Sequence, residues 1–170
     1  MLPSLAYRLI GRFSTSRFDR WLHPLLYRAS GGRGIVGHAL GAEMVLLTTM
    51  GRRSGRPRSV VLFGFRVDGP PGSWAVIGSR GGSGRIPAWY RNLGAHPEAS
   101  LQVRDARTRV RARTVEGPDY EAIFERAAAT YPGYRLYRST ARQPIPIVVL
   151  EPDASARPGA APAPDATPPA

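Results

Sequence analysis

The chain of 170 residues contains no cysteine, and all 24 of its basic residues are arginine. Without cysteine the protein has no disulfide, no thiolate metal site and no cysteine nucleophile. Its three histidines, His23, His38 and His96, lack the spacing of a zinc-binding motif. We therefore expect no metal site. The exclusive use of arginine is compatible with codon composition, so only the sign of the charge is informative.

Acidic residues are also scarce, 12 against 24 basic ones, which leaves a formal net charge of +12. Such a surface attracts anions: nucleic acid, anionic lipid or a polyanionic small molecule. The arginines do not follow the pattern of a recognised nucleic-acid-binding module. We therefore expect no nucleic-acid partner.

Long apolar runs are missing as well. No stretch approaches the roughly 18 residues that a membrane-spanning helix needs. Arg8 and Arg12 interrupt the segment in which a signal peptide would need an apolar core. A cytoplasmic location is the resulting expectation.

Composition divides the chain into three parts. Residues 1–40 form an amphipathic segment, residues 41–152 a folded domain, and residues 153–170 an Ala/Pro-rich tail that we expect to be disordered. From Leu5 to Arg28, leucines and aromatic residues mix with arginines. This mixture predicts one or two helices, broken near residues 14–16 and at Pro24. They either lie on an anionic membrane or pack their apolar face on the domain.

Short apolar runs rich in β-branched and aromatic residues dominate the domain. Strands are predicted at 44–50, 59–67, 74–79, 99–104, 107–115 and 145–150, and helices at 87–94 and 118–130. The strand at 107–115 alternates and places Arg109, Arg111 and Arg113 on one solvated face. Six short strands with two inserted helices indicate a mainly β (α+β) domain, a small antiparallel barrel with short helices at its edge.

A glycine-flanked turn between the first two predicted strands concentrates positive charge. Residues 48–58 carry Arg52, Arg53, Arg56 and Arg58 beside two threonines, Ser54, Gly51 and Gly55. Backbone N–H groups, hydroxyls and guanidinium groups together suit a phosphoryl or carboxylate group. The turn is therefore a candidate anion site. The alternative is an ordinary solvated loop.

A second glycine-rich segment, residues 78–84, follows the predicted strand at 74–79. Its glycines allow the backbone to approach a flat ligand, and Ser79 and Arg80 can bond to the edge of that ligand. The segment lacks the spacing of a dinucleotide fingerprint or a P-loop, and a flexible loop is the alternative. Trp89, on the following predicted helix, either walls a planar cofactor or packs in the core.

Three tyrosines at three-residue spacing, Tyr131, Tyr134 and Tyr137, follow the second predicted helix. This spacing lines them along one face of a turn. Their phenols can donate a hydrogen bond or a proton to a carbonyl or nitro oxygen. The alternative is packing of the helix end.

These segments, in this order, resemble the deazaflavin-dependent nitroreductase family, whose members reduce quinones and nitroaromatics with a reduced 5-deazaflavin coenzyme. The similarity covers about residues 43–152. It is carried by residues 46–58, 79–82, 89–93, 95–97, 131–134 and 145–152.

The resemblance implies a split β-barrel of the flavin-reductase or FMN-binding type. It implies an oxidoreductase that transfers a hydride from reduced coenzyme F420 (8-hydroxy-5-deazaflavin) to a quinone, a nitroaromatic compound or an activated alkene. The coenzyme's phosphate and acidic tail would lie at Arg52, Arg53, Ser54, Gly55 and Arg58, and its ring along Ser79, Arg80, Gly81 and Gly82, with Trp89 nearby. The candidate catalytic residues are Ser79, Tyr131, Tyr134 and Tyr137, with Tyr134 or Tyr137 expected as proton donor or orienting group.

Family members commonly associate with membranes through the N-terminal segment. For this chain, that implies peripheral contact with an anionic membrane at the inner face of the plasma membrane. The oligomeric state is left open.

Two departures from the family pattern concern the site. Arg53 and Arg80 stand where the family often has lysine, and arginine presents a wider fork with the same charge. Phe63 stands where related nitro-reducing members have a tyrosine, which favours quinones over nitroimidazoles as acceptors. The alternatives are a non-catalytic coenzyme- or lipid-binding protein of the same fold and an FMN-dependent reductase.

Overall fold

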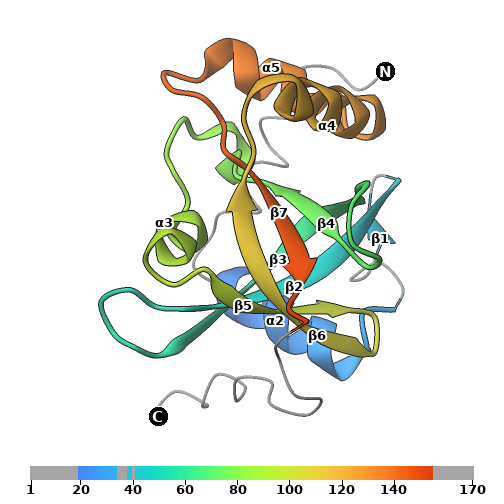
Figure 1. The fold of residues 1–170 in the computed structure, drawn as a ribbon, viewed down its shortest axis with the longest axis vertical. Coiled ribbons are helices and arrows are strands. Elements are labelled where there is room, and N and C mark those ends of the chain that lie inside the picture. The colour runs from blue at the N-terminus through green and yellow to red at the C-terminus, as the bar shows by residue number, and fades with distance from the viewer. Residues whose placement is uncertain (1–18, 34–37, 40, 155–170) are drawn as a thin grey trace.

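The computed structural model describes residues 19–33, 38–39 and 41–154. Its elements are α2 (Asp19–Ala29), β1 (His38–Ala39), β2 (Ala42–Met50), β3 (Pro57–Arg66), β4 (Trp74–Ile77), the 3-10 helix η2 (Arg80–Gly82), α3 (Ala88–Ala95), β5 (Glu98–Val103), β6 (Ala106–Thr114), α4 (Gly117–Thr130), α5 (Gly133–Thr140) and β7 (Ile147–Pro152) (Figure 1). The helix break predicted near residues 14–16 and almost all of the predicted disordered tail lie outside the described residues.

The strands form one antiparallel sheet in the order β1-β2-β3-β4-β7-β6-β5, and pairing of β2 with β5 closes it into a barrel. Leu47 illustrates the closure, because it pairs with Val60 of β3 on one side and with Leu101 of β5 on the other. This confirms the predicted small antiparallel β-barrel. The six predicted strands correspond to β2 to β7. The two-residue strand β1 was not predicted, since it pairs only with the start of β2 and has too few residues to form a pattern.

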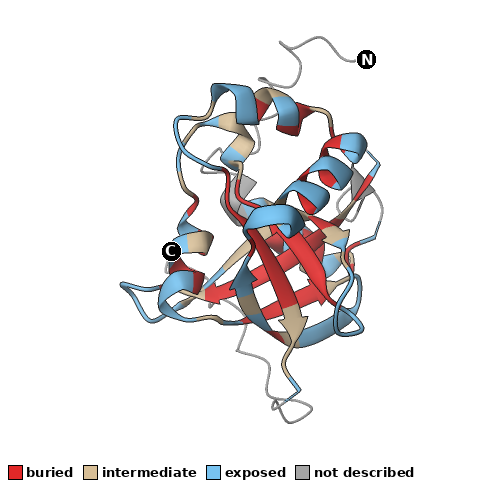
Figure 2. Cartoon of the chain, turned by 45° about the horizontal axis from the view of Figure 1, so that its top comes forward, coloured by how far each residue is buried: buried red, intermediate tan, exposed pale blue. Residues whose placement is uncertain are grey.

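Side chains along the strands alternate between the inside and the outside of the barrel, and this separates an inner core from outer layers. Inside the barrel lie Val45, Leu47, Trp74, Val76, Leu101, Val110, Val148 and Leu150, and the helix α3 adds Trp89 and Leu93. The intervening residues of β4 and β7 face outward, where α4 and α5 cover them. Figure 2 shows this arrangement as buried strands with helices whose exposed faces point away from them. Strands covered on both faces are continuously apolar for that reason.

Helix α5 differs from the sequence prediction. Residues 131–137 were expected to form a turn, but Gly133–Thr140 is helical and packs beside α4. The three-residue spacing of the tyrosines fits a helix as well as a turn, and burial of Tyr134 and Tyr137 against β4 and β7 favours the helix.

Helix α2 continues through Pro24, so the break predicted at this residue is wrong. Proline removes one backbone hydrogen bond from a helix, but packing on the barrel holds this helix in place. Tyr27 is fully buried and its hydroxyl donates to the Met44 carbonyl at 2.8 Å. The same oxygen accepts from the Arg104 N–H at 3.1 Å. This helix therefore lies on the outside of β2 and β3, at the lower end of the molecule in Figure 1.

We expect Tyr27→Phe to lower the free energy of unfolding by about 1–3 kcal/mol, because the buried Met44 carbonyl and the partly buried Arg104 N–H each lose a partner. Urea denaturation measures this loss. Tyr90→Phe is the control, since the Tyr90 hydroxyl has no hydrogen bond to another described residue. Equal stability of the two variants would contradict the anchoring role of Tyr27.

Candidate functional site

The predicted basic turn is the hairpin between β2 and β3, here called the basic loop (residues 51–58). The Gly51 N–H donates to the Arg56 carbonyl at 2.9 Å, and the Gly55 N–H donates back to the Gly51 carbonyl at 2.8 Å. Gly55 has a φ of +60°, a conformation that favours glycine. This tight closure leaves the side chains of Arg52, Arg53 and Arg56, and that of Arg58, exposed.

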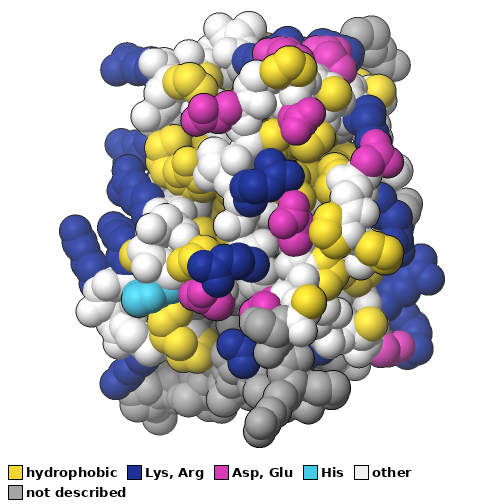
Figure 3. Space-filling view, viewed as in Figure 1, with side chains coloured by type: hydrophobic (Ala, Val, Ile, Leu, Met, Phe, Trp, Pro, Cys, Tyr) yellow, Lys and Arg dark blue, Asp and Glu magenta, His cyan; other side chains and the backbone are white. Residues whose placement is uncertain are grey.

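The arginines of the basic loop differ from most others in what they contact. Arginines elsewhere, such as Arg111, Arg113 and Arg138, form ion pairs with Glu98, Glu151 and Glu121. Within the described part of the chain, no carboxylate lies at ion-pairing distance from Arg52, Arg53, Arg56, Arg58, Arg80, Arg85 or Arg91. Basic side chains line the left edge of the molecule, over the basic loop and α3 (Figure 3). Arginines without internal partners are available to an external anion.

Helix α3 lies between the basic loop and η2 (Figure 1). Its Asn92 is 5% exposed and reaches the basic loop. The Asn92 Oδ1 accepts from the Arg52 N–H at 3.2 Å, and its Nδ2 donates to Thr49 Oγ1 at 3.1 Å. The sequence prediction missed this residue. The one available signal was a polar residue beside Leu93 on the apolar face of the predicted helix.

The predicted ring-binding segment forms the short helix η2. Arg80, Gly81 and Gly82 have φ values of 47°, 60° and 73°, which the two glycines adopt readily and arginine does not. Ser79, at the start of η2, is half-buried, and its hydroxyl has no hydrogen bond to another described residue. The segment therefore offers a free hydroxyl and a backbone that a flat ligand can approach closely.

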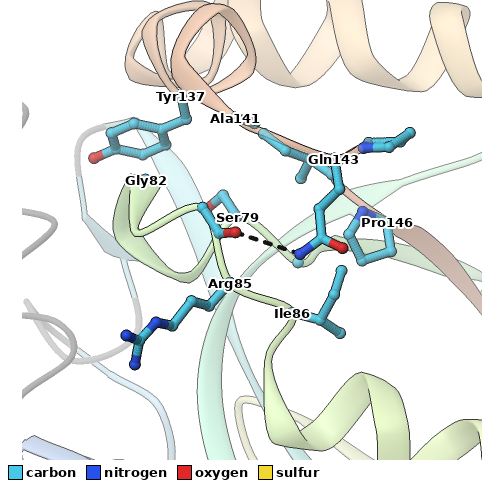
Figure 4. Close-up of a pocket in the computed structure, with 12 residues that line it drawn as sticks. Ser79, Gly82, Arg85, Ile86, Tyr137, Ala141, Gln143 and Pro146 are labelled. Carbon is cyan, nitrogen blue, oxygen red and sulfur yellow. Dashed lines mark hydrogen bonds between the residues drawn. The ribbon is translucent and has the colours of Figure 1, made fainter.

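Tyr137 covers this segment from α5. An added Cβ on Gly82 would lie 2.3 Å from Tyr137 Cδ1, so the ring rests on the glycine backbone. Figure 4 shows the Tyr137 ring over Gly82 with its hydroxyl turned away from Ser79. That hydroxyl lies 2.9 Å from the Tyr131 hydroxyl. Tyr137 therefore holds η2 through its ring, and its hydroxyl belongs to a buried pair.

A cavity of about 10 Å³ lies beside Ser79 and Tyr137 and is bordered by Gln143 and Pro146. Gln143 Nε2 donates to the Gly84 carbonyl across its rim (Figure 4). A volume of this size holds about one water molecule. The cavity is therefore too small to enclose a flat ligand.

Tyr134 is 3% exposed, about as deeply buried as Tyr131 and Tyr137 beside it. Burial, with a smaller contribution from Tyr137, raises its pKa well above the ordinary value for tyrosine. The phenol is neutral at physiological pH and packs edge-on against Tyr131 and Tyr137. The structure thus places Tyr134 in the core rather than on the surface of the site.

This burial predicts a stability that depends on pH. The raised pKa means that the folded state favours the neutral phenol. Tyr134 therefore stabilises the folded state fully below pH 10.0, the ordinary tyrosine pKa, and this stabilisation is lost as the pH rises above that value. For Tyr134 the free energy of unfolding should fall by about 1.4 kcal/mol per pH unit above that value. Urea denaturation between pH 8 and 11 measures the slope. Tyr134→Phe should reduce it, and an unchanged slope would contradict the assignment.

Trp89 and Phe63 occupy different positions relative to the site. Trp89 is 6% exposed and fills the end of the barrel beside Leu93. Its indole thus packs in the core beneath α3. Phe63 on β3 is half-buried, and its ring centroid lies 5.4 Å from that of Tyr131. Phe63 therefore borders the tyrosine cluster.

A larger hollow, of about 650 Å³, lies elsewhere on the described residues. Its walls include Glu43, Arg66, Trp74 and Val103, which stand at the strand ends opposite the basic loop. None of the predicted site residues borders it. The basic loop, α3, η2 and α5 together form the candidate site at the other end of the barrel.

Comparison with known families supports the resemblance seen in the sequence. The model of the family described as F420H(2)-dependent quinone reductase matches residues 21–152. An F420H(2)-dependent quinone reductase of Mycobacterium tuberculosis (strain ATCC 25618 / H37Rv) is 36% identical over 134 residues, which cover 76% of this chain and 87% of that protein.

Two solved structures are similar in fold and sequence. One is titled as an F420-H2 dependent reductase (FDR-A). It has a TM-score of 0.58 at 34% identity, and the match covers 64% of this chain and 93% of that one. The second is titled as a domain-swapped dimer. It has a TM-score of 0.60 at 32% identity, and the match covers 80% of this chain and 100% of that one.

Proposed function

This chain belongs to the F420H(2)-dependent quinone reductase family, and on that premise we propose that it reduces a quinone with F420 held between the basic loop and η2. It is an oxidoreductase that uses reduced F420. The observation that carries the proposed site is the set of arginines on one side of the barrel that have no carboxylate partner among the described residues. The Ser79 hydroxyl, which has no hydrogen bond to a described residue, adds to it.

The residues present fit the coenzyme. Its phosphate and acidic tail match the exposed guanidinium groups of Arg52, Arg53 and Arg58, with the Ser54 hydroxyl and the Gly55 backbone beside them. Its flat ring matches the segment from Ser79 to Gly82, where Gly81 and Gly82 carry no side chains and no residue of η2 is buried. Charge at one end and a glycine surface at the other are the two requirements of an amphipathic, polyanionic cofactor.

When bound, reduced F420 supplies the hydride, and the quinone also takes up one proton to become a hydroquinone. The protein binds the coenzyme and the quinone and orients them toward each other. The basic loop anchors the charged end, and the Ser79 hydroxyl donates a hydrogen bond to the acceptor oxygen. Tyr137 fixes η2 from above, and Tyr131 holds the Tyr137 hydroxyl. Tyr134 contributes through packing, so we assign it no chemical step.

A fluorescence titration of the protein with F420 and, separately, with FMN tests the cofactor. Binding of FMN alone would overturn the proposal. Steady oxidation of reduced F420 by menadione then tests turnover, and tight coenzyme binding without oxidation would favour a non-catalytic binding protein. A nitroimidazole assayed beside menadione tests the acceptor class. We expect faster turnover of the quinone, because Phe63 lacks a hydroxyl to bond a nitro group.

We also propose that α2 rests on an anionic membrane. Tyr27 faces the barrel, while Leu22, Leu25 and Leu26 on the same helix are 36%, 61% and 44% exposed. Three exposed leucines at this spacing form an apolar stripe on the outer face of the helix. An amphipathic helix on a strongly basic protein binds anionic lipid surfaces. No helix in the described part of the chain is long and apolar enough to cross a bilayer.

Co-sedimentation with vesicles tests this contact. We expect binding to vesicles that contain phosphatidylglycerol, and a loss of most of that binding in the variant Leu25→Ser/Leu26→Ser. Ala122→Ser/Ala129→Ser, on the exposed face of α4, is the control and should bind as the unchanged protein does. Equal binding of both variants would contradict a lipid-facing α2.

A further inference from the structure

We propose that Asn92 is a positioning residue that holds the basic loop in the conformation that binds the charged end of the coenzyme. This inference rests on the proposed function and extends it to a residue of α3. The observations are the burial of Asn92 and the two hydrogen bonds that its side chain forms with Arg52 and Thr49.

The side-chain amide of Asn92 has one orientation that fits its neighbours. Its oxygen faces the Arg52 N–H, which only donates, and its nitrogen faces the Thr49 hydroxyl. Rotating the amide by half a turn would place two donors against each other at Arg52. Asn92 therefore accepts from the loop on one side and donates to the strand on the other.

The hydrogen bonds continue beyond Thr49 to the second half of the hairpin. Thr49 is 1% exposed, and its hydroxyl accepts from Asn92 and donates to the Arg58 carbonyl at 3.4 Å. Asn92 thus connects to the main chain of Arg52 directly and to that of Arg58 through Thr49. The two ends of the basic loop are held by one side chain from a neighbouring helix.

No backbone hydrogen bond within the hairpin joins the basic loop to α3. The bonds between Gly51 and Gly55 and between Gly51 and Arg56 close the loop on itself, but they do not connect it to α3. Because Arg52, Arg53 and Arg58 lack carboxylate partners among the described residues, their own side chains do not fix the loop either. The strand ladders hold the base of the hairpin, and Asn92 supplies the hydrogen bonds that join the loop to α3, on the side that faces η2.

The first test compares two ligands of one chromophore. For Asn92→Leu, we expect F420 to bind about tenfold more weakly, as the loss of buried hydrogen bonds implies. The deazaflavin chromophore without phosphate and glutamates should bind as it does to the unchanged protein. The KM for reduced F420 should rise and kcat should stay the same. Equal weakening for both ligands, or an unchanged F420 affinity, would overturn the proposal.

Matched variants separate positioning from general destabilisation. Thr49→Val keeps the shape but removes the hydroxyl, so it should weaken F420 binding in the same ligand-selective way and by a smaller factor. Ser73→Ala removes a buried hydroxyl that donates to the Pro70 carbonyl at 2.6 Å, at the other end of the barrel. It should leave the affinity for F420 unchanged. A similar loss of affinity in Ser73→Ala would assign the effect to stability alone.

A second readout needs no coenzyme. Trypsin cleaves after exposed arginines, so cleavage after Arg52 and Arg53 of the ligand-free protein reports how firmly the loop is held. Asn92→Leu should accelerate these cleavages several-fold and leave cleavage elsewhere unchanged. Unchanged cleavage in the loop would overturn the positioning role. If F420 did not bind the unchanged protein, the proposed function would fail, while the cleavage result would still decide the role of Asn92.

Discussion

Replacing Arg52 and Arg58 together with alanine is expected to weaken the binding of F420 by about a hundredfold or more. Each guanidinium group offers charge-assisted hydrogen bonds to a phosphate or carboxylate, and each such bond typically contributes about a factor of ten to affinity. Both side chains are exposed and have no carboxylate partner among the described residues, so little internal structure is lost with them. Fluorescence titration at low ionic strength measures the change.

The matched control removes the same number of positive charges elsewhere. Arg111 and Arg135 are about as exposed but pair with Glu98 and Glu125. Arg111→Ala/Arg135→Ala should leave F420 affinity within a factor of about three, because only long-range attraction is reduced and salt screens it. Similar losses in both variants would show that net charge, rather than the basic loop, binds the coenzyme.

Gly82→Ala is expected to abolish most of the reductase activity and to destabilise the protein. The new methyl group would lie 2.3 Å from the Tyr137 ring. Overpacking of this kind costs about 1–3 kcal/mol, and a φ of 73° adds about 1–2 kcal/mol for a residue with a Cβ. Either η2 or Tyr137 must move, so Ser79 loses its position. Menadione-dependent oxidation of reduced F420 and urea denaturation measure the two effects.

Gly84 provides a control for backbone strain alone. Its φ is +67°, close to that of Gly82, but an added Cβ would meet no atom within 4 Å. Gly84→Ala should therefore lower the free energy of unfolding only by the cost of the backbone strain, and the variant should keep its activity. Adding Tyr137→Ala to Gly82→Ala should cost less than the sum of the two single changes, because the clash is then absent. Full additivity would contradict contact between the two residues.

Local pattern predicted much of the barrel. The apolar run from Met44 to Leu47 predicted a buried strand, and β2 is indeed covered inside by the barrel core and outside by α2. Gly51 and Gly55 predicted the tight hairpin between β2 and β3, and the structure confirms it. These features depend on residues close together in the chain, so the sequence displays them directly.

Other features depend on contacts between distant segments. Pro24 reads as a helix break, but packing of Tyr27 on β2 keeps α2 continuous. The tyrosine spacing fits a turn or a helix, and burial decides for the helix. Asn92 reads as an ordinary polar residue of α3 until the fold brings it to Thr49, 43 positions away.

The sequence by itself determined the excess of arginine, the β-rich architecture and the two glycine-rich segments, because composition and short-range periodicity encode them. Only the tertiary structure decided which arginines are neutralised. Arg113 pairs with Glu151, 38 positions away, whereas Arg52 and Arg58 pair with no carboxylate of the described residues. Ion pairing depends on distances of a few ångströms in space, and the closure of the barrel sets these distances. The same closure brings α3 between the basic loop and η2, and so joins two separate motifs into one candidate site.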